Sequence, residues 1–140
     1  MAQREPNRFA LLILFQAENE AKVSASSLTA SIRDALFTHW GEFHLAAATL
    51  KVVFLDYFDK SHAIAILRFP RNFAGQVLSS CALLLECNDT CLAVRVLRIS
   101  GRLRNSAEAG VHAVRLMQSM KNAKSDCPVI VKLLDLPEYA

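Results

Sequence analysis

The segment Phe9–Phe15 is apolar at every position, and this run constrains the fold more than any other part of the chain. It is far shorter than the ~20 residues that a membrane-spanning helix needs. Because side chains of a strand alternate between two faces, a continuous apolar run is typical of a strand buried on both sides. We therefore expect a central strand at 8–16, in a sheet whose second face is also covered, either by the third helix of this chain or by another protein.

Apolar periodicity and turn residues divide the rest of the chain into strands and helices. A serine cluster at 24–27 can cap a helix, and Gly41 stands where that helix would end. Pro128–Leu136 is a short apolar tail, expected to form an edge strand or a packed arm. The remaining predicted elements are strands at 48–58, 62–69 and 91–99, helices at 26–40 and 71–85, and a helix that starts near Asn105 and fades at Asn122–Ser125.

The order of these elements is βαββαβα. With right-handed crossovers, this order predicts an α+β fold, the ferredoxin-like (RRM-like) βαββαβ sandwich, here with an added C-terminal helix and a short tail. The strands at 8–16 and 62–69 would be central. No linker divides the chain, so we expect a single domain over residues 1–140, with a core at about 8–124 and a tail at 125–140.

Positive charge is concentrated in the second half of the chain. The 140 residues carry a net charge of +3, but residues 68–124 hold nine basic and three acidic residues. Most of these cations are arginines, whose planar donors match the geometry of phosphate. The distribution indicates either a polyanionic partner or a solvated basic face.

The sequence lacks the usual signatures of an enzyme. It contains no Gly-rich phosphate loop of the Walker or Rossmann pattern and no Gly-x-Ser-x-Gly elbow. Cys87 and Cys91 form one C-x3-C pair without a second knuckle, and the histidines are scattered, so we predict no metal site and no catalytic residue. The N-terminus mixes charges and lacks a secretory signal, so we expect a soluble intracellular protein without membrane contact.

RNA-recognition motif domains have the same element order and stack bases on aromatic residues of two central strands. The strand at 62–69 carries one aromatic ring, Phe69 at its end, and the strand at 8–16 places Leu11 and Ile13 beside its rings. The sheet is too aliphatic to be a base-stacking platform. If the protein binds RNA, we expect the basic loop at 100–104 and the following helix to contact phosphates.

Three segments resemble the Pop-five subunit of ribonuclease P and ribonuclease MRP: residues 43–52 (FHLAAATLKV), 63–69 (AIAILRF) and 96–104 (VLRISGRLR). In the last of these, Gly101, Leu103 and Arg104 match the family's Gly-rich loop, whereas Ser100 replaces a frequent second glycine and Arg102 a small polar residue. The similarity covers about residues 8–120.

This resemblance implies a non-catalytic subunit of a ribonucleoprotein that removes the 5′ leader of precursor tRNA, with which it has only indirect contact. It implies that the RNA carries the active site and its magnesium ions, and that this chain needs no cofactor. The implied partners are ribonuclease P or MRP RNA, an Rpp-thirty-like subunit and an Rpp-fourteen/Pop-eight-like paralogue. The implied location is the nucleus and nucleolus in a eukaryote, or the cytoplasm in an archaeon.

Two alternatives stay open at the level of the sequence. The chain could be the smaller Rpp-fourteen/Pop-eight-type paralogue itself, although the loop at 100–104 favours the Pop-five type. It could also be an ACT-like regulatory module, which would bind a small ligand in a pocket between two domains. Such modules usually accompany an enzyme domain, which is not present in this sequence.

The predicted site has an RNA-binding part and a protein-binding part. Gly101 would allow a sharp turn near a phosphate, and a helix capped by Asn105 and Glu108 would direct N–H groups at an anion. Arg95 and Arg98 alternate within one strand, so we expect them to face different directions; Arg104 could pair with a partner's carboxylate instead of RNA. The predicted RNA-binding residues are Arg98, Gly101, Arg102, Arg104, Arg115 and Lys121. The predicted protein-interface residues are Phe9, Leu11, Ile64, Ile66 and Arg95.

Overall fold

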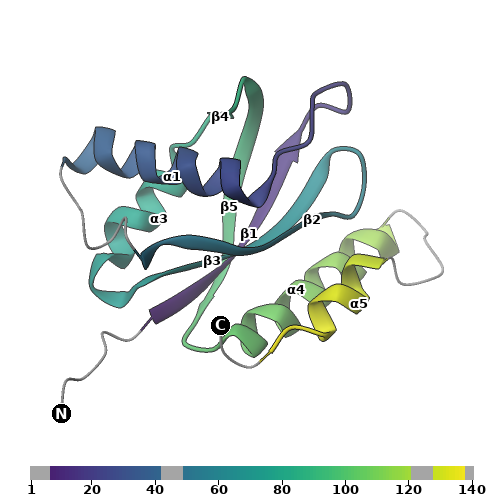
Figure 1. Cartoon of the computed structure of the whole chain (residues 1–140). Coiled ribbons are helices and arrows are strands. Elements are labelled where there is room, and N and C mark those ends of the chain that lie inside the picture. The colour runs from purple at the N-terminus through teal and green to yellow at the C-terminus, as the bar shows by residue number, and fades with distance from the viewer. Residues whose placement is uncertain (1–6, 42–48, 121–127, 138–140) are drawn as a thin grey trace, which may run out of the picture.

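A computed structural model describes residues 7–41, 49–120 and 128–137 of the chain. These residues form one antiparallel sheet, curled and five-stranded, with the order β2-β3-β1-β5-β4 (Figure 1). The strands are β1 (Asn7–Gln16), β2 (Lys51–Tyr57), β3 (His62–Pro70), β4 (Glu86–Cys87) and β5 (Thr90–Ser100). The expected ferredoxin-like α+β fold is confirmed, with β1 and β3 inside the sheet; the short β4 is an addition at the edge.

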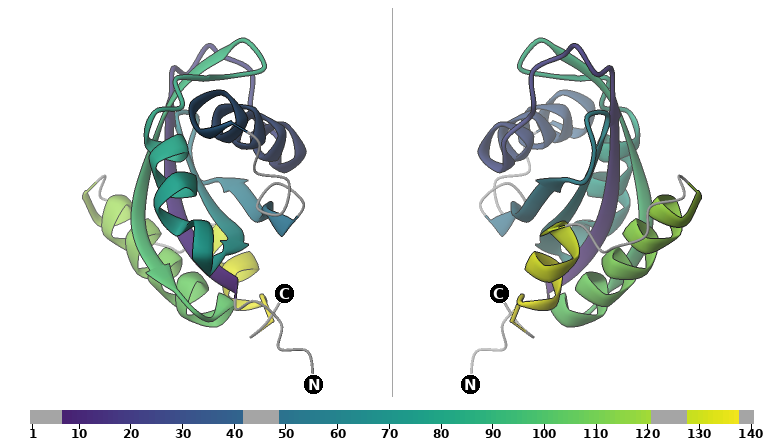
Figure 2. Two further views of the ribbon diagram at one scale, coloured as in Figure 1. Left: turned by 90° about the vertical axis from the view of Figure 1, so that its left-hand side faces the viewer. Right: turned by 90° about the vertical axis from the view of Figure 1, so that its right-hand side faces the viewer.

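Helices cover both faces of this sheet (Figure 2). α1 (Ala25–Trp40) and α3 (Ala74–Ala82), which follows the short 3-10 helix Arg71–Phe73, lie on the first face. α4 (Leu103–Met120) and α5 (Pro128–Leu134) lie on the second face. The sandwich therefore has three layers instead of two.

β1 contributes alternate side chains to two separate cores, as its apolar run predicts. Ala10, Leu12 and Leu14 pack under α1 and α3. Phe9, Leu11 and Ile13 pack under α4 and α5, together with Ile64 and Ile66 of β3. The sequence left open whether a helix or another protein covers the second face, and the chain's own α4 and α5 cover it.

The boundaries of α1 follow from its capping residues. The Ser24 side chain accepts a hydrogen bond from the Ser27 N–H at 3.2 Å, as an N-cap does. Gly41 has φ of 78°, and its N–H donates to the Phe37 carbonyl at 2.9 Å. The predicted helix at 26–40 is therefore confirmed. The next predicted helix, 71–85, is shorter in the structure because its first turn is the 3-10 helix and its regular part ends at Ala82.

The C-terminal apolar tail is helical. Pro128, whose fixed φ suits the first turn of a helix, begins α5, and Val129, Ile130 and Leu133 are buried against the second face. The expectation of an edge strand is wrong. The other expectation, a packed arm, is confirmed, because α5 packs against the sheet.

The starts of α4, on the second face, and of β2, at the sheet edge, also differ from the predicted ones. α4 begins at Leu103, two residues before the expected cap at Asn105, and the Arg102 carbonyl accepts from the Ser106 N–H. β2 begins at Lys51. The first residue of the predicted strand, Ala48, and the predicted end of the last helix lie outside the described residues.

A β-bulge in β5 changes the direction of its arginines. Leu11 pairs with Arg98 but Leu12 pairs with Val96, so Leu97 is the extra residue. Since directly paired residues share a face, Arg98 opposite Leu11 and Arg95 opposite Ile13 both lie on the α4 side of the sheet. The expectation that they face different directions is wrong, because it assumed uninterrupted alternation.

Candidate nucleic-acid interface

One end of the sheet collects cations from segments that are far apart in the sequence. β1 and β2 begin at this end, and β3 and β5 finish there, as the pairs Phe9–Ser100, Phe9–Arg68 and Lys51–Arg68 show. We call this surface the basic end and define it by Arg8, Lys51, Arg68, Arg71, Arg102 and Arg104.

The opposite end of the sheet carries acidic loops. Glu18 and Glu20 lie between β1 and α1, Asp59 lies in the β2–β3 turn, and Asp89 lies in the β4–β5 turn. Two cations, Lys22 and Lys60, lie in the same loops, so acids outnumber bases there by two. The chain's modest net charge therefore hides a separation of charge along the strand direction. Such a separation orients the molecule in the field of a polyanion.

Lys51 and Arg68 are directly opposite each other on neighbouring strands and on the same face. Like charges at paired positions destabilise a sheet unless an anion lies between them. The Nε atom of Arg68 is buried, and among the residues that the structure describes it has no hydrogen-bond acceptor. A buried donor without an acceptor is costly, so an anion at this place would relieve both problems.

The basic loop contains Arg102 and is extended by a residue that the sequence analysis missed. Gly101 and Arg102 are exposed, and the Arg102 N–H donates to Ser100 Oγ at 3.2 Å. Arg8, at the start of β1, reaches this loop: a Cβ built at Gly101 would lie 3.5 Å from Arg8 Nη1. The antiparallel pairing of the start of β1 with the end of β5 is the signal that could have identified Arg8.

The chain bends at Gly101, and a close approach of this glycine to a phosphate stays a prediction. Gly41 is the one described glycine with positive φ, so the backbone at Gly101 needs no left-handed conformation. Asn105 is not a cap, because α4 begins earlier, and Glu108 lies in the second turn. Arg104 lies in the first turn of α4 instead of the loop, and it is exposed.

The structure does not gather all the predicted RNA-binding residues. Gly101, Arg102 and Arg104 lie together at the basic end. Arg98 is exposed farther along β5, and Arg115 is eleven positions after Arg104 on α4, or about 16 Å along the helix axis. Lys121 lies outside the described residues.

Most of the predicted protein interface is inside the molecule. Phe9, Leu11, Ile64 and Ile66 are at most 4% exposed, because α4 and α5 cover them. While the two helices are packed, these side chains offer a partner almost no surface, so they do not form the interface that the sequence analysis predicted. Arg95 is exposed on β5.

Asp59, His62 and Asp56 have side chains that could act in catalysis or bind a metal, but their described contacts are to other residues of the fold. Asp59 accepts from the N–H groups of Ser61 and His62 at 2.7 Å, and His62 Nδ1 lies 2.8 Å from both Asp59 oxygens. Asp56 contacts Lys132 of α5 at 2.6 Å. Within residues 7–41, 49–120 and 128–137, no group of three His, Cys, Asp or Glu side chains could hold a metal ion. No helix in these ranges has the length and apolar character needed to cross a bilayer.

Comparisons with known proteins agree with the resemblance found in the sequence. A chain in the cryo-EM structure of yeast ribonuclease MRP has the same fold, with a TM-score of 0.53 and 15% sequence identity over 87% of this chain and 99% of that one. No curated protein matches the sequence. The family model described as the Rpp14/Pop5 family matches residues 8–111, which include β1, α1, α3, β5 and the basic loop. The match spans well over half of the chain, and the protein therefore belongs to the Rpp14/Pop5 family of ribonuclease P proteins.

Proposed function

We propose that this chain is a Pop-five-type accessory subunit of ribonuclease P, and of ribonuclease MRP, and that it binds the particle's RNA through the basic end. Membership of the Rpp14/Pop5 family supports the assignment to ribonuclease P, and the fold shared with a chain of yeast ribonuclease MRP supports the assignment to both particles. The observation that carries RNA binding is the cross-strand pair of Lys51 and Arg68, with its buried donor, at the same end of the sheet as the contact of Arg8 with the basic loop.

Phosphate is the anion that best fits this surface. The basic end presents arginine donors from β1, β3, the basic loop and α4, and arginine forms paired hydrogen bonds with phosphate oxygens. A row of cations along one end of a sheet can follow a phosphate backbone without reading bases. The protein would therefore recognise the shape and charge of a folded RNA.

In this proposal the RNA carries the active site with its magnesium ions, and the protein stabilises the RNA. An Rpp-thirty-like subunit and an Rpp-fourteen/Pop-eight-like paralogue are its protein partners, and precursor tRNA is an indirect one. The match of Gly101, Leu103 and Arg104 favours the Pop-five type over the smaller paralogue. The nucleus and nucleolus, or the archaeal cytoplasm, would be its location.

The test is the affinity of the purified chain for transcribed ribonuclease P RNA and MRP RNA at several salt concentrations. Arg102→Ala with Arg104→Ala should weaken binding, and each lost phosphate contact should flatten the slope of log K against log salt by about 0.7–0.9. Arg8→Ala should flatten this slope by a similar amount. Lys60→Ala, a cation in the β2–β3 turn at the other end of the sheet, is the matched control and should leave the slope unchanged.

Two results would contradict the proposal. The first is an unchanged salt slope in the arginine variants whose thermal unfolding is normal. The second is cleavage of precursor tRNA by the RNA-free protein in magnesium, lost in a point variant of this chain, since that would place the active site in the protein.

A further inference from the structure

We propose that the outer edge of β5, with the groove between β5 and α4, binds an extended segment of a partner protein in which acidic and aliphatic residues alternate. This surface is separate from the row of cations at the basic end, and the proposal does not depend on RNA binding.

The backbone of β5 has an open edge. β4 pairs only with Thr90 and Cys91, and one further hydrogen bond joins the Leu92 N–H to the Leu85 carbonyl at 3.0 Å. From Ala93 to Ser100, no strand in the described part of the chain pairs with the outer side of β5. An edge of this kind is a template for an added strand, because its outward N–H and C=O groups lack partners.

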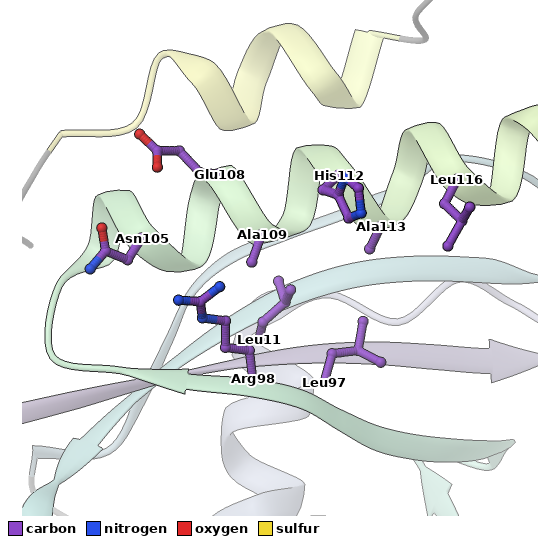
Figure 3. Close-up of a pocket in the computed structure, with 9 residues that line it drawn as sticks. All are labelled: Leu11, Leu97, Arg98, Asn105, Glu108, Ala109, His112, Ala113 and Leu116. Atoms are coloured by element: carbon purple, nitrogen blue, oxygen red, sulfur yellow. The ribbon is translucent and has the colours of Figure 1, made fainter.

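The groove beside this edge is apolar and has room for side chains. It has a volume of about 470 Å³, with Leu11 at its floor and Leu97 and Leu116 at its sides (Figure 3). Ala109 and Ala113 are the smallest of the α4 residues that line it, and their short side chains leave the space open. Leu97 and Leu116 are 42% and 56% exposed. Aliphatic side chains of an added strand would cover them.

Charge on the same side of β5 selects an acidic partner. The bulge at Leu97 brings Arg95 and Arg98 to the α4 side, where both are exposed. In the described ranges, neither arginine has a carboxylate partner. His112 lies on the groove, as does Glu108, whose carboxylate points away from β5 (Figure 3). Carboxylates two residues apart on an added strand would face the two arginines.

The same features argue against two other occupants. A second copy paired through the same edge about a two-fold axis would bring four arginines, Arg95 and Arg98 of each copy, to one seam, and like charges at neighbouring positions destabilise a sheet. RNA would find phosphate-binding cations here, but the imidazole of His112 is the one ring among the residues that line the groove, so successive bases have no row of rings on which to stack. A protein strand satisfies the backbone edge, the groove and the arginines together.

The test uses the full-length chain in its native cells, with photoreactive benzoylphenylalanine in place of Leu97. Leu83, 56% exposed at the end of α3, receives the same group as the matched control position. Irradiation followed by mass spectrometry should join Leu97, but not Leu83, to one protein, at a segment of alternating acidic and aliphatic residues. Arg95→Glu with Arg98→Glu should lower this crosslink about tenfold, and lysines in place of the partner's acids should restore it.

Lys60→Glu, an exposed charge reversal in the β2–β3 turn, should leave the crosslink unchanged. The proposal is overturned by a Leu97 crosslink no stronger than that of Leu83, by a crosslink to RNA or to a second copy, or by one that survives the double arginine reversal. Loss of RNA binding in the Arg102 and Arg104 variants with an intact Leu97 crosslink would separate this surface from the basic end. A Leu97 crosslink in a protein that binds no RNA would refute only the proposed function.

Discussion

Gly110 is the residue at which α4, β1 and α5 come closest together. A Cβ built there would lie 3.2 Å from Leu133 Cδ1 and 3.3 Å from Leu11 Cδ1. Contacts this short require the neighbouring side chains to move, so the glycine allows the close approach that covers the second face. Gly75 of α3 provides a comparison, because a Cβ built there, also in an α-helix, meets nothing within 4 Å.

Gly110→Leu should therefore lower the free energy of unfolding by about 1–3 kcal/mol, since extra methylenes in a filled core force side chains and backbone apart. Gly110→Ala should stay within about 1 kcal/mol of the wild type, because the gain in helix propensity opposes the tighter contact. Urea unfolding measures both. Gly75→Leu is the control and should be neutral or stabilising; equal losses at the two glycines would disprove the close-packing argument.

Cys81 offers a second prediction at this scale. Burial raises the pKa of its thiol to about 12, and the thiolate is the reactive form. At pH 8, iodoacetamide should therefore modify exposed Cys91 well before Cys81, which should react only at the rate of unfolding. Mass spectrometry of digested samples gives the rates. Because the folded thiol holds its proton longer than an unfolded one, Cys81 should also remove stability as pH rises from about 9 towards 12. Fast alkylation of Cys81 under native conditions would contradict this assignment.

At the scale of elements, Tyr57 joins β2 to the connection between β1 and α1. Its hydroxyl donates to Gln16 Oε1 and accepts from the Val23 N–H at 2.8 Å. Lys22 Nζ lies 5.2 Å from the centre of the Tyr57 ring. Burial raises the pKa of Tyr57 more than the hydrogen bond from Val23 lowers it, so the hydroxyl keeps its proton and remains a donor. These contacts hold the acidic end of the sheet in place.

Tyr57→Phe should lower the free energy of unfolding by about 1–3 kcal/mol, since it leaves the buried Gln16 side chain and the Val23 N–H short of a partner. Gln16→Leu should have less effect in the Tyr57→Phe background than in the wild type. Thermal or urea unfolding of the four proteins in this double-mutant cycle gives the coupling, expected at about 0.5–3 kcal/mol. Strictly additive losses would show that the two side chains do not act together.

At the scale of the whole molecule, stability depends on helices that cover both faces of the sheet. The second core joins Phe9, Leu11 and Ile13 of β1 to the inner sides of α4 and α5. Exposed apolar patches beyond a few hundred Å² mark association surfaces. α5 covers part of the apolar surface that the second face of the sheet would otherwise expose. The ion pair of Lys132 with Asp56 also ties α5 to β2, but because Lys132 is 59% exposed its contribution is small.

Leu133→Asp should detach α5, because a carboxylate cannot be buried without a partner. The variant should keep its far-ultraviolet circular dichroism, bind more of the dye ANS and self-associate in size-exclusion chromatography. Leu134→Asp is the matched control, since Leu133 is fully buried and its neighbour is 51% exposed. Equal dye binding by the two variants would mean that α5 is not needed to cover the sheet.

Features that depend on neighbouring residues could be predicted from the sequence. The apolar run of β1, the Ser24 cap and Gly41 of α1, and the order of the elements all follow from local chemistry, and they are enough for the ferredoxin-like fold. The family resemblance also rests on short local segments, and the match over residues 8–111 confirms it. The concentration of arginine was visible, but not which of these arginines share a surface.

The tertiary structure decided which segments, far apart in the sequence, become neighbours in the fold. α5 is helical because its apolar side chains find a sheet face to cover, although the segment alone is too short to form a stable helix in water. The bulge that turns Arg95 and Arg98 to one side is a property of the register between β1 and β5, which no local pattern reveals. In the same way, Arg8, Lys51 and Arg68 become neighbours of the basic loop only because antiparallel pairing brings the start of one strand to the end of another.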